Sequence, residues 1–104
     1  MAFPRLVKIV GFDWDEGNTS HIAKHNVLPK EAEDVFFDKN NVLEDDPKHS
    51  EIEQRYLVVG KTKGERLLYQ VFTIRDNKIR VISSRDINKK EASLYEKKTD
   101  TSKI

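Results

Sequence analysis

Alternating hydrophobic and polar positions predict three consecutive β-strands in the second half of the chain. These segments are rich in Val, Ile, Leu, Tyr and Phe, and they span residues 55–60, 66–75 and 78–86. Short polar links separate them, and the second link is the dipeptide Asp76-Asn77, so the order predicts an antiparallel meander. A further strand is expected over residues 5–14 and a short one at Val42-Leu43.

Helical spacing and capping residues predict three helices, at about residues 18–25, 29–37 and 88–97. Asn18 is expected to cap the first helix, and Asn26 to end it in a left-handed conformation. Pro29 suits the first turn of the second helix. Asn88 and Glu91 form a near capping box at the start of the third. The polar stretch 44–53 is expected to be a loop.

These elements predict one α+β domain. Its two layers would be an antiparallel sheet and a set of helices, two of them N-terminal and one C-terminal. A chain of 104 residues has room for a single domain, which we place at 1–98, with a flexible tail at 99–104. The absence of cysteine excludes disulfides and thiolate metal sites. No long apolar segment or signal peptide is recognisable, so we expect a cytoplasmic protein with no membrane contact.

Charge is distributed unevenly between the two halves of the chain. Residues 1–54 contain 6 basic and 12 acidic side chains, whereas residues 55–104 contain 13 and 6. Such a split indicates an anionic partner for one part of the molecule. It is equally compatible with two halves that neutralise each other across a compact fold.

The predicted hairpin register gathers basic side chains on one face of the sheet. One face would carry Tyr69, Val71, Thr73, Arg75, Lys78, Arg80, Ile82 and Ser84, and the other Leu68, Gln70, Phe72, Ile74, Ile79, Val81, Ser83 and Arg85. Neighbouring like charges cost stability unless an anion compensates them, so Arg75, Lys78 and Arg80 predict a phosphate-sized pocket. The alternative is a solvated face whose arginines pair with carboxylates such as Glu53 or Glu65.

Histidines and one carboxylate are the candidates for proton transfer. His21 and His25 are four residues apart on one helix face, but no cysteine or obvious third ligand accompanies them, so no metal is expected. His25 could donate or accept a proton near neutral pH, although a structural helical histidine is the more common case. Glu53 beside Arg55 could be a general base, or an ordinary ion pair.

An ordered set of residue blocks resembles the BrnT-family toxins. The blocks are Phe12–Asn18, Lys24-His25, Glu31–Phe36, Glu53–Tyr56, Arg66–Leu68, Val71–Arg75, Ile79–Arg85 and Glu91 with Tyr95. They cover about residues 9–97. Asn26 stands where the family usually has Gly, which Asn can replace in a left-handed turn. Asn18 stands in a region where many members carry Lys, so this chain lacks that charge there.

The resemblance implies a two-layer fold like that of RelE-type toxins and a metal-independent endoribonuclease that inhibits translation. It also implies a BrnA-type ribbon-helix-helix antitoxin, which binds the toxin and represses their shared operon, so that operator DNA is contacted only through the complex. If the site residues of the family occupy the matching positions of this chain, the resemblance implies an active site drawn from His25, Glu53, Arg55, Arg75, Arg80 and Arg85. We expect further RNA contacts from Lys24, Thr73, Lys78 and Tyr95. No cofactor is expected.

This chemistry agrees with the arginine face. RNA carries its own nucleophile, the 2′-hydroxyl, so the protein need only align it, move protons and neutralise the phosphorane. Either Glu53 or His25 could be the base, and a 2′,3′-cyclic phosphate is the expected product. The competing hypothesis is a catalytically weak module that binds an antitoxin to regulate their operon.

Overall fold

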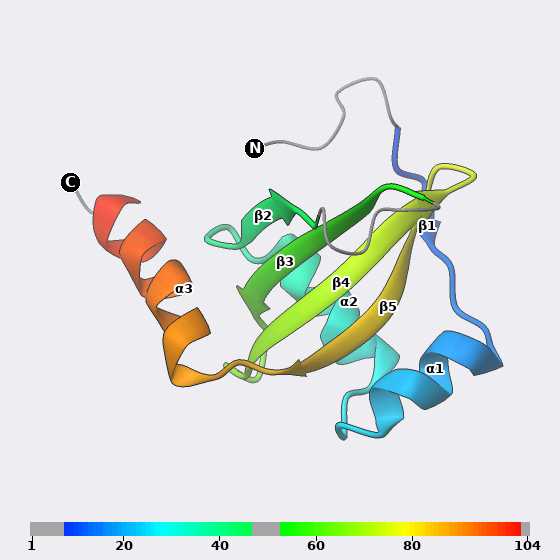
Figure 1. Cartoon of the computed structure of the whole chain (residues 1–104), viewed down its shortest axis with the longest axis horizontal. Coiled ribbons are helices and arrows are strands. Elements are labelled where there is room, and N and C mark those ends of the chain that lie inside the picture. Colours follow the sequence, from blue (N-terminus) through cyan, green and yellow to red (C-terminus); the bar gives the residue numbers. More distant parts are fainter. Residues whose placement is uncertain (1–7, 47–52, 103–104) are drawn as a thin grey trace.

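The computed structural model describes residues 8–46 and 53–102, and within them it contains one sheet and three helices (Figure 1). The strands are β1 (Gly11–Phe12), β2 (Val42–Asp45), β3 (Arg55–Lys61), β4 (Leu67–Arg75) and β5 (Lys78–Asp86). The helices are α1 (Glu16–Ala23), α2 (Pro29–Phe37) and α3 (Lys89–Ser102). The predicted α+β class, with two N-terminal helices and one C-terminal helix, is confirmed.

The sheet has the order β1-β5-β4-β3-β2, and the described helices cover its two faces differently. Helix α2 packs behind β3 and β4, on what we call the inner face, and α1 lies along β5 (Figure 1). Helix α3 flanks the far end of the opposite, outer face beside β2. Among the described residues, no helix lies across the middle of the outer face, which α1 and α3 border. No described helix is long and apolar enough to cross a membrane.

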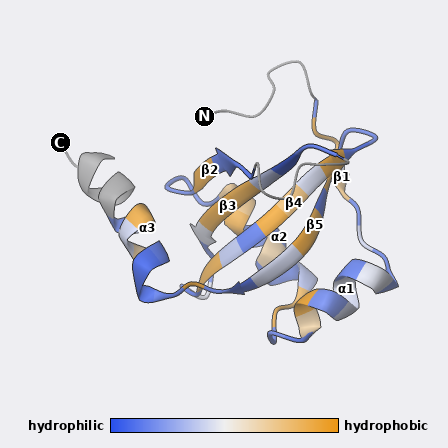
Figure 2. Cartoon of the chain, in the orientation of Figure 1, coloured by the Kyte–Doolittle hydropathy of each residue, from blue (hydrophilic) through white to orange (hydrophobic). Residues whose placement is uncertain are grey.

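The inner face carries the hydrophobic core. Phe72 of β4 is fully buried, with the Phe36 ring edge-on at 4.9 Å and the Tyr56 ring stacked at 5.3 Å between centroids. Gly60 of β3 lets α2 approach, because a Cβ atom there would lie 2.8 Å from a methyl group of Val35. Because successive side chains of a strand point to opposite faces, only one set of them enters this core, and the longer strands carry both hydrophobic and hydrophilic residues (Figure 2).

The β4–β5 hairpin has the predicted turn but not the predicted register along its whole length. Asp76 and Asn77 have φ values of 51° and 62°, as a two-residue type I′ turn requires, and Arg75 pairs with Lys78. A bulge between Val71 and Phe72 then shifts the pairing by one residue.

Because of this bulge, three predicted side-chain orientations were wrong: Ser83, which pairs with Val71 on the outer face, Ser84 and Arg85. Ser84 faces inward, where its hydroxyl donates to Gln70 Oε1 at 2.7 Å in a fully buried pair. Gln70 Nε2 in turn donates to the Ala32 carbonyl of α2 at 3.1 Å. Arg85 pairs with Tyr69 on the outer face. The bulge thus lets a buried polar pair reach α2 and turns an arginine outward.

Several element boundaries also differ from the predictions. The sheet is mixed, because β1 runs parallel to β5 and is only two residues long, where a strand over 5–14 was expected. Residues 5–7 of that segment lie outside the described part, as do 47–52 of the expected loop. Residues 44 and 45 extend β2 instead. Helix α3 continues to Ser102, beyond the expected end near Lys97.

Helix α1 is capped differently from the prediction. Asp15 is the N-cap, and its carboxylate accepts from the main-chain N–H of Asn18 at 3.2 Å. Asn18 occupies the third helical position and completes the capping box. Its amide nitrogen also donates to the carbonyls of Asp13 and Val81, at 2.9 and 3.0 Å. Asn18 is therefore the buried link that fixes α1 against β5.

Candidate active site

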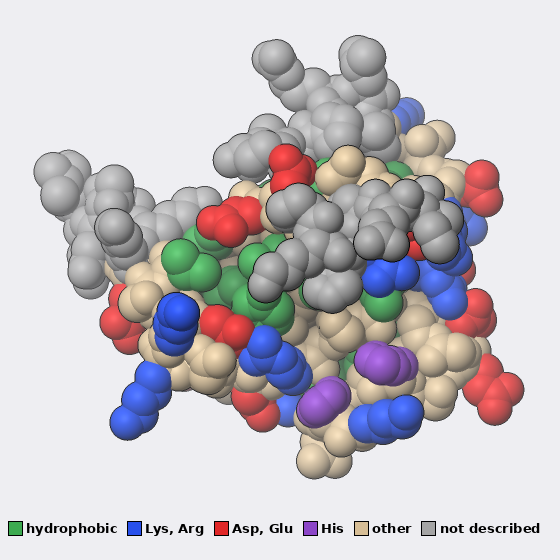
Figure 3. All heavy atoms as spheres, viewed as in Figure 1, with side chains coloured by type: hydrophobic (Ala, Val, Ile, Leu, Met, Phe, Trp, Pro, Cys, Tyr) green, Lys and Arg blue, Asp and Glu red, His purple; other side chains and the backbone are tan. Residues whose placement is uncertain are grey.

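The outer face contains a hollow of about 270 Å³ where α1 meets the sheet. Its lining residues are Gly17, Asn18, His21, Arg55, Arg75, Arg80 and Ile82. Arg55, Arg75 and Arg80 come from three adjacent strands, β3, β4 and β5, which bring them together from distant parts of the sequence. Figure 3 shows histidines with Lys and Arg side chains beside them on the α1 side of this face, and further basic side chains toward α3.

Arg80 forms the wall of the hollow nearest to α1. Its guanidinium lies 3.0 Å from Asp15 Oδ2 and 3.5 Å from Asp13 Oδ2, and Nη2 donates to Asp15 Oδ1 at 3.1 Å. Only 16% of the Arg80 side chain is exposed. The hydrogen bond from Arg80 lowers the pKa of the Asp15 carboxyl. The N-cap of α1 therefore also orients the arginine.

Glu53 connects the other two arginines. Its carboxylate accepts two hydrogen bonds from Arg75, Nε at 3.1 Å and Nη2 at 2.9 Å, and lies 3.8 Å from Arg55 Nη2. These parallel bonds hold the Arg75 guanidinium in one plane. The hydrogen bond from Arg75 is also the main reason that the pKa of Glu53 is lowered, so the carboxylate stays ionised.

Opposite charges balance around the hollow. The three arginines face Asp13, Asp15 and Glu53, so an incoming phosphate competes with carboxylates that are already bound. These ion pairs are partly exposed to solvent. An exposed ion pair contributes about 0–1 kcal/mol to stability. A phosphate held by two or three guanidinium groups can therefore displace the carboxylates.

The structure brings four of the expected catalytic residues together: Glu53, Arg55, Arg75 and Arg80. Lys78 lies directly opposite Arg75 at the exposed end of the hairpin, as expected. Thr73 lies in the row between Arg55 and Arg80, but it is only 2% exposed and its hydroxyl donates to the Gln54 carbonyl at 2.7 Å. This hydroxyl supports the sheet beneath the arginines.

Two other expected residues lie at the opposite end of α1 from its N-cap. Lys24 is the C-cap of α1 and His25 follows it; both are exposed, and neither lines the hollow. The His25 carbonyl accepts from Arg66 Nη2 at 3.0 Å. Arg66 also binds Asp86, with Nε 2.7 Å from Oδ1, so it ties this turn to the end of β5.

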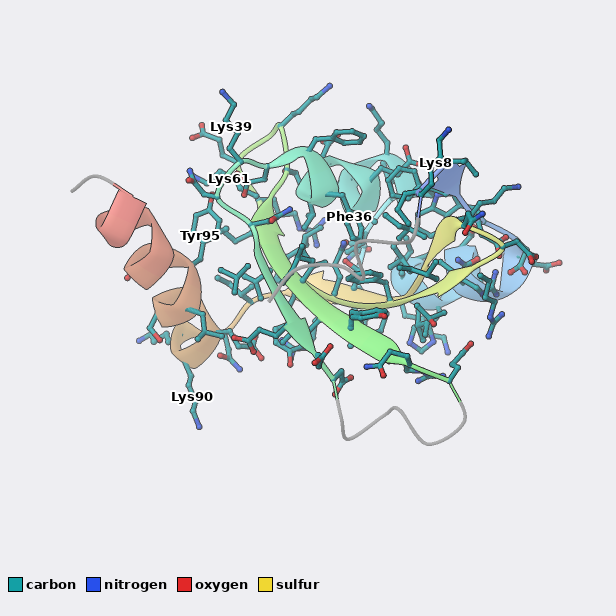
Figure 4. The ribbon with its side chains drawn as sticks, turned by 90° about the horizontal axis from the view of Figure 1, so that it is seen from above. Lys8, Phe36, Lys39, Lys61, Lys90 and Tyr95 are labelled. Atoms are coloured by element: carbon teal, nitrogen blue, oxygen red, sulfur yellow. The ribbon has the colours of Figure 1, made fainter. Side chains whose placement is uncertain are left out.

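Arg85 and Tyr95 lie toward α3. Arg85 donates to both carboxylate oxygens of Glu91 at 2.8 Å, and its guanidinium lies 4.3 Å from the centre of the Tyr69 ring. The Tyr95 hydroxyl donates to Asp38 Oδ2 at 2.9 Å. Figure 4 shows Tyr95 beside Lys61 on the α3 side of the molecule, well away from Lys8 and the α1 side. Both residues join α3 to the domain, and neither lines the hollow.

Sequence reasoning did not single out three residues of this candidate site: His21, which lines the hollow, and Asp13 and Asp15, which pair with Arg80 at its edge. The sequence offered His21 only as half of a metal pair. Asp13 and Asp15 partner Arg80 across 67 and 65 positions of sequence, a contact that no local pattern encodes. His21 lies three residues after Asn18 and therefore on the same side of α1, but the contact of Asn18 with β5 that orients this side appears only in the fold.

No group of three or more His, Asp and Glu side chains in the described part of the chain is arranged to hold a metal ion. His49, which carried no supporting pattern, and Glu51, which shares the parity of Glu53, both lie outside the described residues.

Comparison with known sequences identifies the family. No curated protein sequence matches the chain significantly. Residues 14–91, which are more than half of the chain and include α1, the hollow and the strands that build it, match the family described as "Ribonuclease toxin, BrnT, of type II toxin-antitoxin system". The chain therefore belongs to the BrnT family of ribonuclease toxins from type II toxin-antitoxin systems.

Proposed function

We propose that this protein is a metal-independent endoribonuclease that inhibits translation by cutting RNA in the arginine-lined hollow. The observation that carries the proposal is the convergence of Arg55, Arg75 and Arg80 from three strands on one hollow of the outer face. Guanidinium groups bind phosphate oxygens in pairs, which suits a pentacoordinate phosphorane that carries extra negative charge.

The reaction uses the 2′-hydroxyl of the RNA as nucleophile. Its oxygen attacks the neighbouring phosphorus while the bond to the 5′-oxygen breaks, which leaves a 2′,3′-cyclic phosphate and a free 5′-hydroxyl. Arg75 and Arg80 hold the phosphate, and Glu53 keeps Arg75 in place. Alignment and charge neutralisation supply most of the rate enhancement in such a site.

The protein partner in this proposal is a BrnA-like ribbon-helix-helix antitoxin, which neutralises the toxin and carries the complex to operator DNA. The site of action is the cytoplasm, where the RNA substrate is found. The toxin itself contacts RNA through the outer face and contacts DNA only as part of the complex.

The test is inducible expression in bacteria, with growth and total RNA integrity followed over time. We expect the wild type to arrest growth and degrade RNA, and Arg80→Ala to do neither. Arg66→Ala is the matched control, because it also removes an arginine with carboxylate partners, but outside the hollow. Growth arrest that persists in Arg80→Ala, or cleavage of purified RNA that requires Mg²⁺, contradicts the proposal.

A second candidate function is a binding module that pairs with an antitoxin to regulate their operon and cuts RNA weakly or not at all. It is favoured by the carboxylates that already engage the three arginines, as in a structural ion-pair network. This function predicts normal growth on expression of the wild type together with tight antitoxin binding. The same expression experiment therefore distinguishes the two.

A further inference from the structure

We propose that His21 is the general base that removes the proton from the RNA 2′-hydroxyl. This inference rests on the proposed function and assigns the proton transfer to a residue outside the set that the sequence had offered for it. His21 lies on α1, is exposed, and lines the same hollow as the three arginines. An imidazole in this position can contact a substrate whose phosphate lies among the guanidinium groups.

The placement of His21 is firmly determined by its helix. Asn18, one turn earlier, is 4% exposed and donates to the Val81 carbonyl of β5, next to Arg80. The Asp15 cap binds Arg80 directly. Since residues three apart lie on the same side of a helix, these contacts turn His21 toward the arginines. A general base must be held within hydrogen-bond reach of the proton that it removes, and the fixed position of α1 holds His21 in one place.

The carboxylates of the site are poor alternatives. Both oxygens of Glu53 accept hydrogen bonds from Arg75, and this lowers the pKa of Glu53. Asp15 is bound to Arg80 through both oxygens, which lowers its pKa as well, and Asp13 lies 3.5 Å from the same guanidinium. A carboxylate with a lowered pKa is a weaker base. Their geometry suits holding arginines better than accepting a proton.

His25 is the other alternative, and its position excludes it from the hollow. It follows the C-cap of α1 and lies at the turn that Arg66 binds through main-chain carbonyls. It also lies near Asp86, at the end of β5 that is distant from Arg80. Of the two described histidines, only His21 lines the arginine hollow.

The proposed step balances as follows. The neutral imidazole of His21 takes the proton of the 2′-hydroxyl, the O2′–P bond forms, and the P–O5′ bond breaks. The departing 5′-oxygen takes a proton from solvent water, and the imidazolium returns its proton to solvent. The charged groups that line the hollow with His21 are Arg55, Arg75 and Arg80, and their carboxylate partners are Glu53, Asp13 and Asp15. Lys24 and His25 follow His21 by three and four residues along the same side of the chain segment that forms α1 and its C-cap.

The test compares purified wild type, His21→Asn and the matched control His25→Asn in cleavage of an RNA oligonucleotide between pH 5 and 9. We expect His21→Asn to lose about 100-fold or more in kcat with little change in KM. Imidazoles change charge between about pH 5 and 8, so the fall in kcat toward low pH should disappear in this variant. Added imidazole should restore part of the activity of His21→Ala, and His25→Asn should behave like the wild type.

A binding measurement separates the role of His21 from the integrity of the hollow. A 2′-deoxy oligonucleotide should bind His21→Asn as tightly as it binds the wild type, which shows that the arginine hollow is intact. If wild type and Arg80→Ala differ as proposed but His21→Asn keeps the kcat and pH profile of the wild type, the role of His21 is overturned and the ribonuclease function stands. A wild type that cleaves no RNA overturns both.

Discussion

The arginines within residues 55–104 fall into two groups according to the partners of their side chains. Arg66 and Arg85 join elements: Arg66 binds Asp86 and main-chain carbonyls of the α1–α2 turn, and Arg85 binds Glu91 of α3. Arg55, Arg75 and Arg80 instead surround one hollow, where the partner carboxylate of Arg80, Asp15, is exposed and that of Arg75, Glu53, is half-buried. An arginine whose partner is an exposed carboxylate can exchange that partner for a phosphate at little cost in stability.

Asp15→Asn tests this exchange at a single residue. Asn is as good an N-cap as Asp, so α1 should keep its cap while Arg80 loses a charged partner. A phosphate then meets less competition, and we expect affinity for a 2′-deoxy oligonucleotide to rise about two- to fivefold, as expected for a surface ion pair. Fluorescence anisotropy at fixed salt measures the change. The control is Glu16→Gln, which removes an exposed charge from the same helix; an equal gain in both variants would mean that only net charge matters.

At the scale of elements, the β4–β5 hairpin decides where the arginines lie. Its turn sets Arg75 opposite Lys78 and Thr73 opposite Arg80, and the bulge beyond Phe72 ends this register. Helix α3 is held separately, by the Tyr95 hydroxyl on Asp38 and by the Arg85–Glu91 pair. The hollow thus depends on the hairpin and α1, while α3 contributes to stability from a distance.

Substitution of Asn77 tests the hairpin turn. Asn77 has a φ of 62°, which glycine adopts freely and alanine adopts only with strain. We expect Asn77→Ala to lower the free energy of unfolding by about 1 kcal/mol, and Asn77→Gly to leave it unchanged or raise it by a few tenths. Urea unfolding followed by circular dichroism measures both. Equal stability of the two variants would contradict a left-handed turn residue.

Tyr95→Phe tests the attachment of α3. Burial and the hydrogen bond to Asp38 raise the pKa of Tyr95 to about 12. The unfolded chain ionises this phenol near pH 10, so the folded state loses stability as pH rises from about 10 toward 12. We expect Tyr95→Phe to cost about 1 kcal/mol at neutral pH and to lose less stability than the wild type across the alkaline range. Parallel alkaline curves for the two proteins would show that Tyr95 titrates normally.

At the scale of the whole molecule, ion pairs between arginines and carboxylates connect most of the elements. Arg80 joins β5 to the cap of α1, Arg66 joins the α1–α2 turn to the end of β5, and Arg85 joins β5 to α3. A domain of this size buries a modest core, so such links contribute a visible share of its stability. The pairs Arg80–Asp15, Arg75–Glu53 and Arg66–Glu31 each join an acidic side chain of residues 1–54 to an arginine of residues 55–104, as expected where the two halves neutralise each other.

Acid should therefore destabilise the fold. Hydrogen bonds from Arg80, Arg75, Arg66 and Arg85 lower the pKa values of Asp15, Glu53, Asp86 and Glu91, respectively. A carboxyl group with a lowered folded-state pKa stabilises the fold above its unfolded pKa and loses this contribution as pH falls through the folded one. We expect the free energy of unfolding to be constant from pH 7 to about 5 and to fall below about pH 4. Urea titrations across this range measure it, and a stability that does not change down to pH 2 would contradict the linkage.

Local chemistry in the sequence determined much of this molecule. The spacing of hydrophobic residues, Pro29 at a helix start, Asn26 in a left-handed turn and the Asn88–Glu91 capping box all act within a few residues. The two-residue turn at Asp76-Asn77 fixed the register near the loop, and with it the grouping of Arg75 and Arg80. These features could be predicted because each interaction is complete within one segment or one hairpin.

Tertiary structure alone decided the rest. The bulge turned Ser84 inward and Arg85 outward, and it goes together with a buried Gln70–Ser84 pair that reaches the Ala32 carbonyl of α2. The choice of His21 over His25 depends on Asn18 binding β5, a contact between residues 63 positions apart. Burial and hydrogen bonding across such distances depend on the packed chain as a whole, so no local pattern carries them. The sequence by itself determined which residues this site has available, and only the packing of α1 on β5 decided which of them meet.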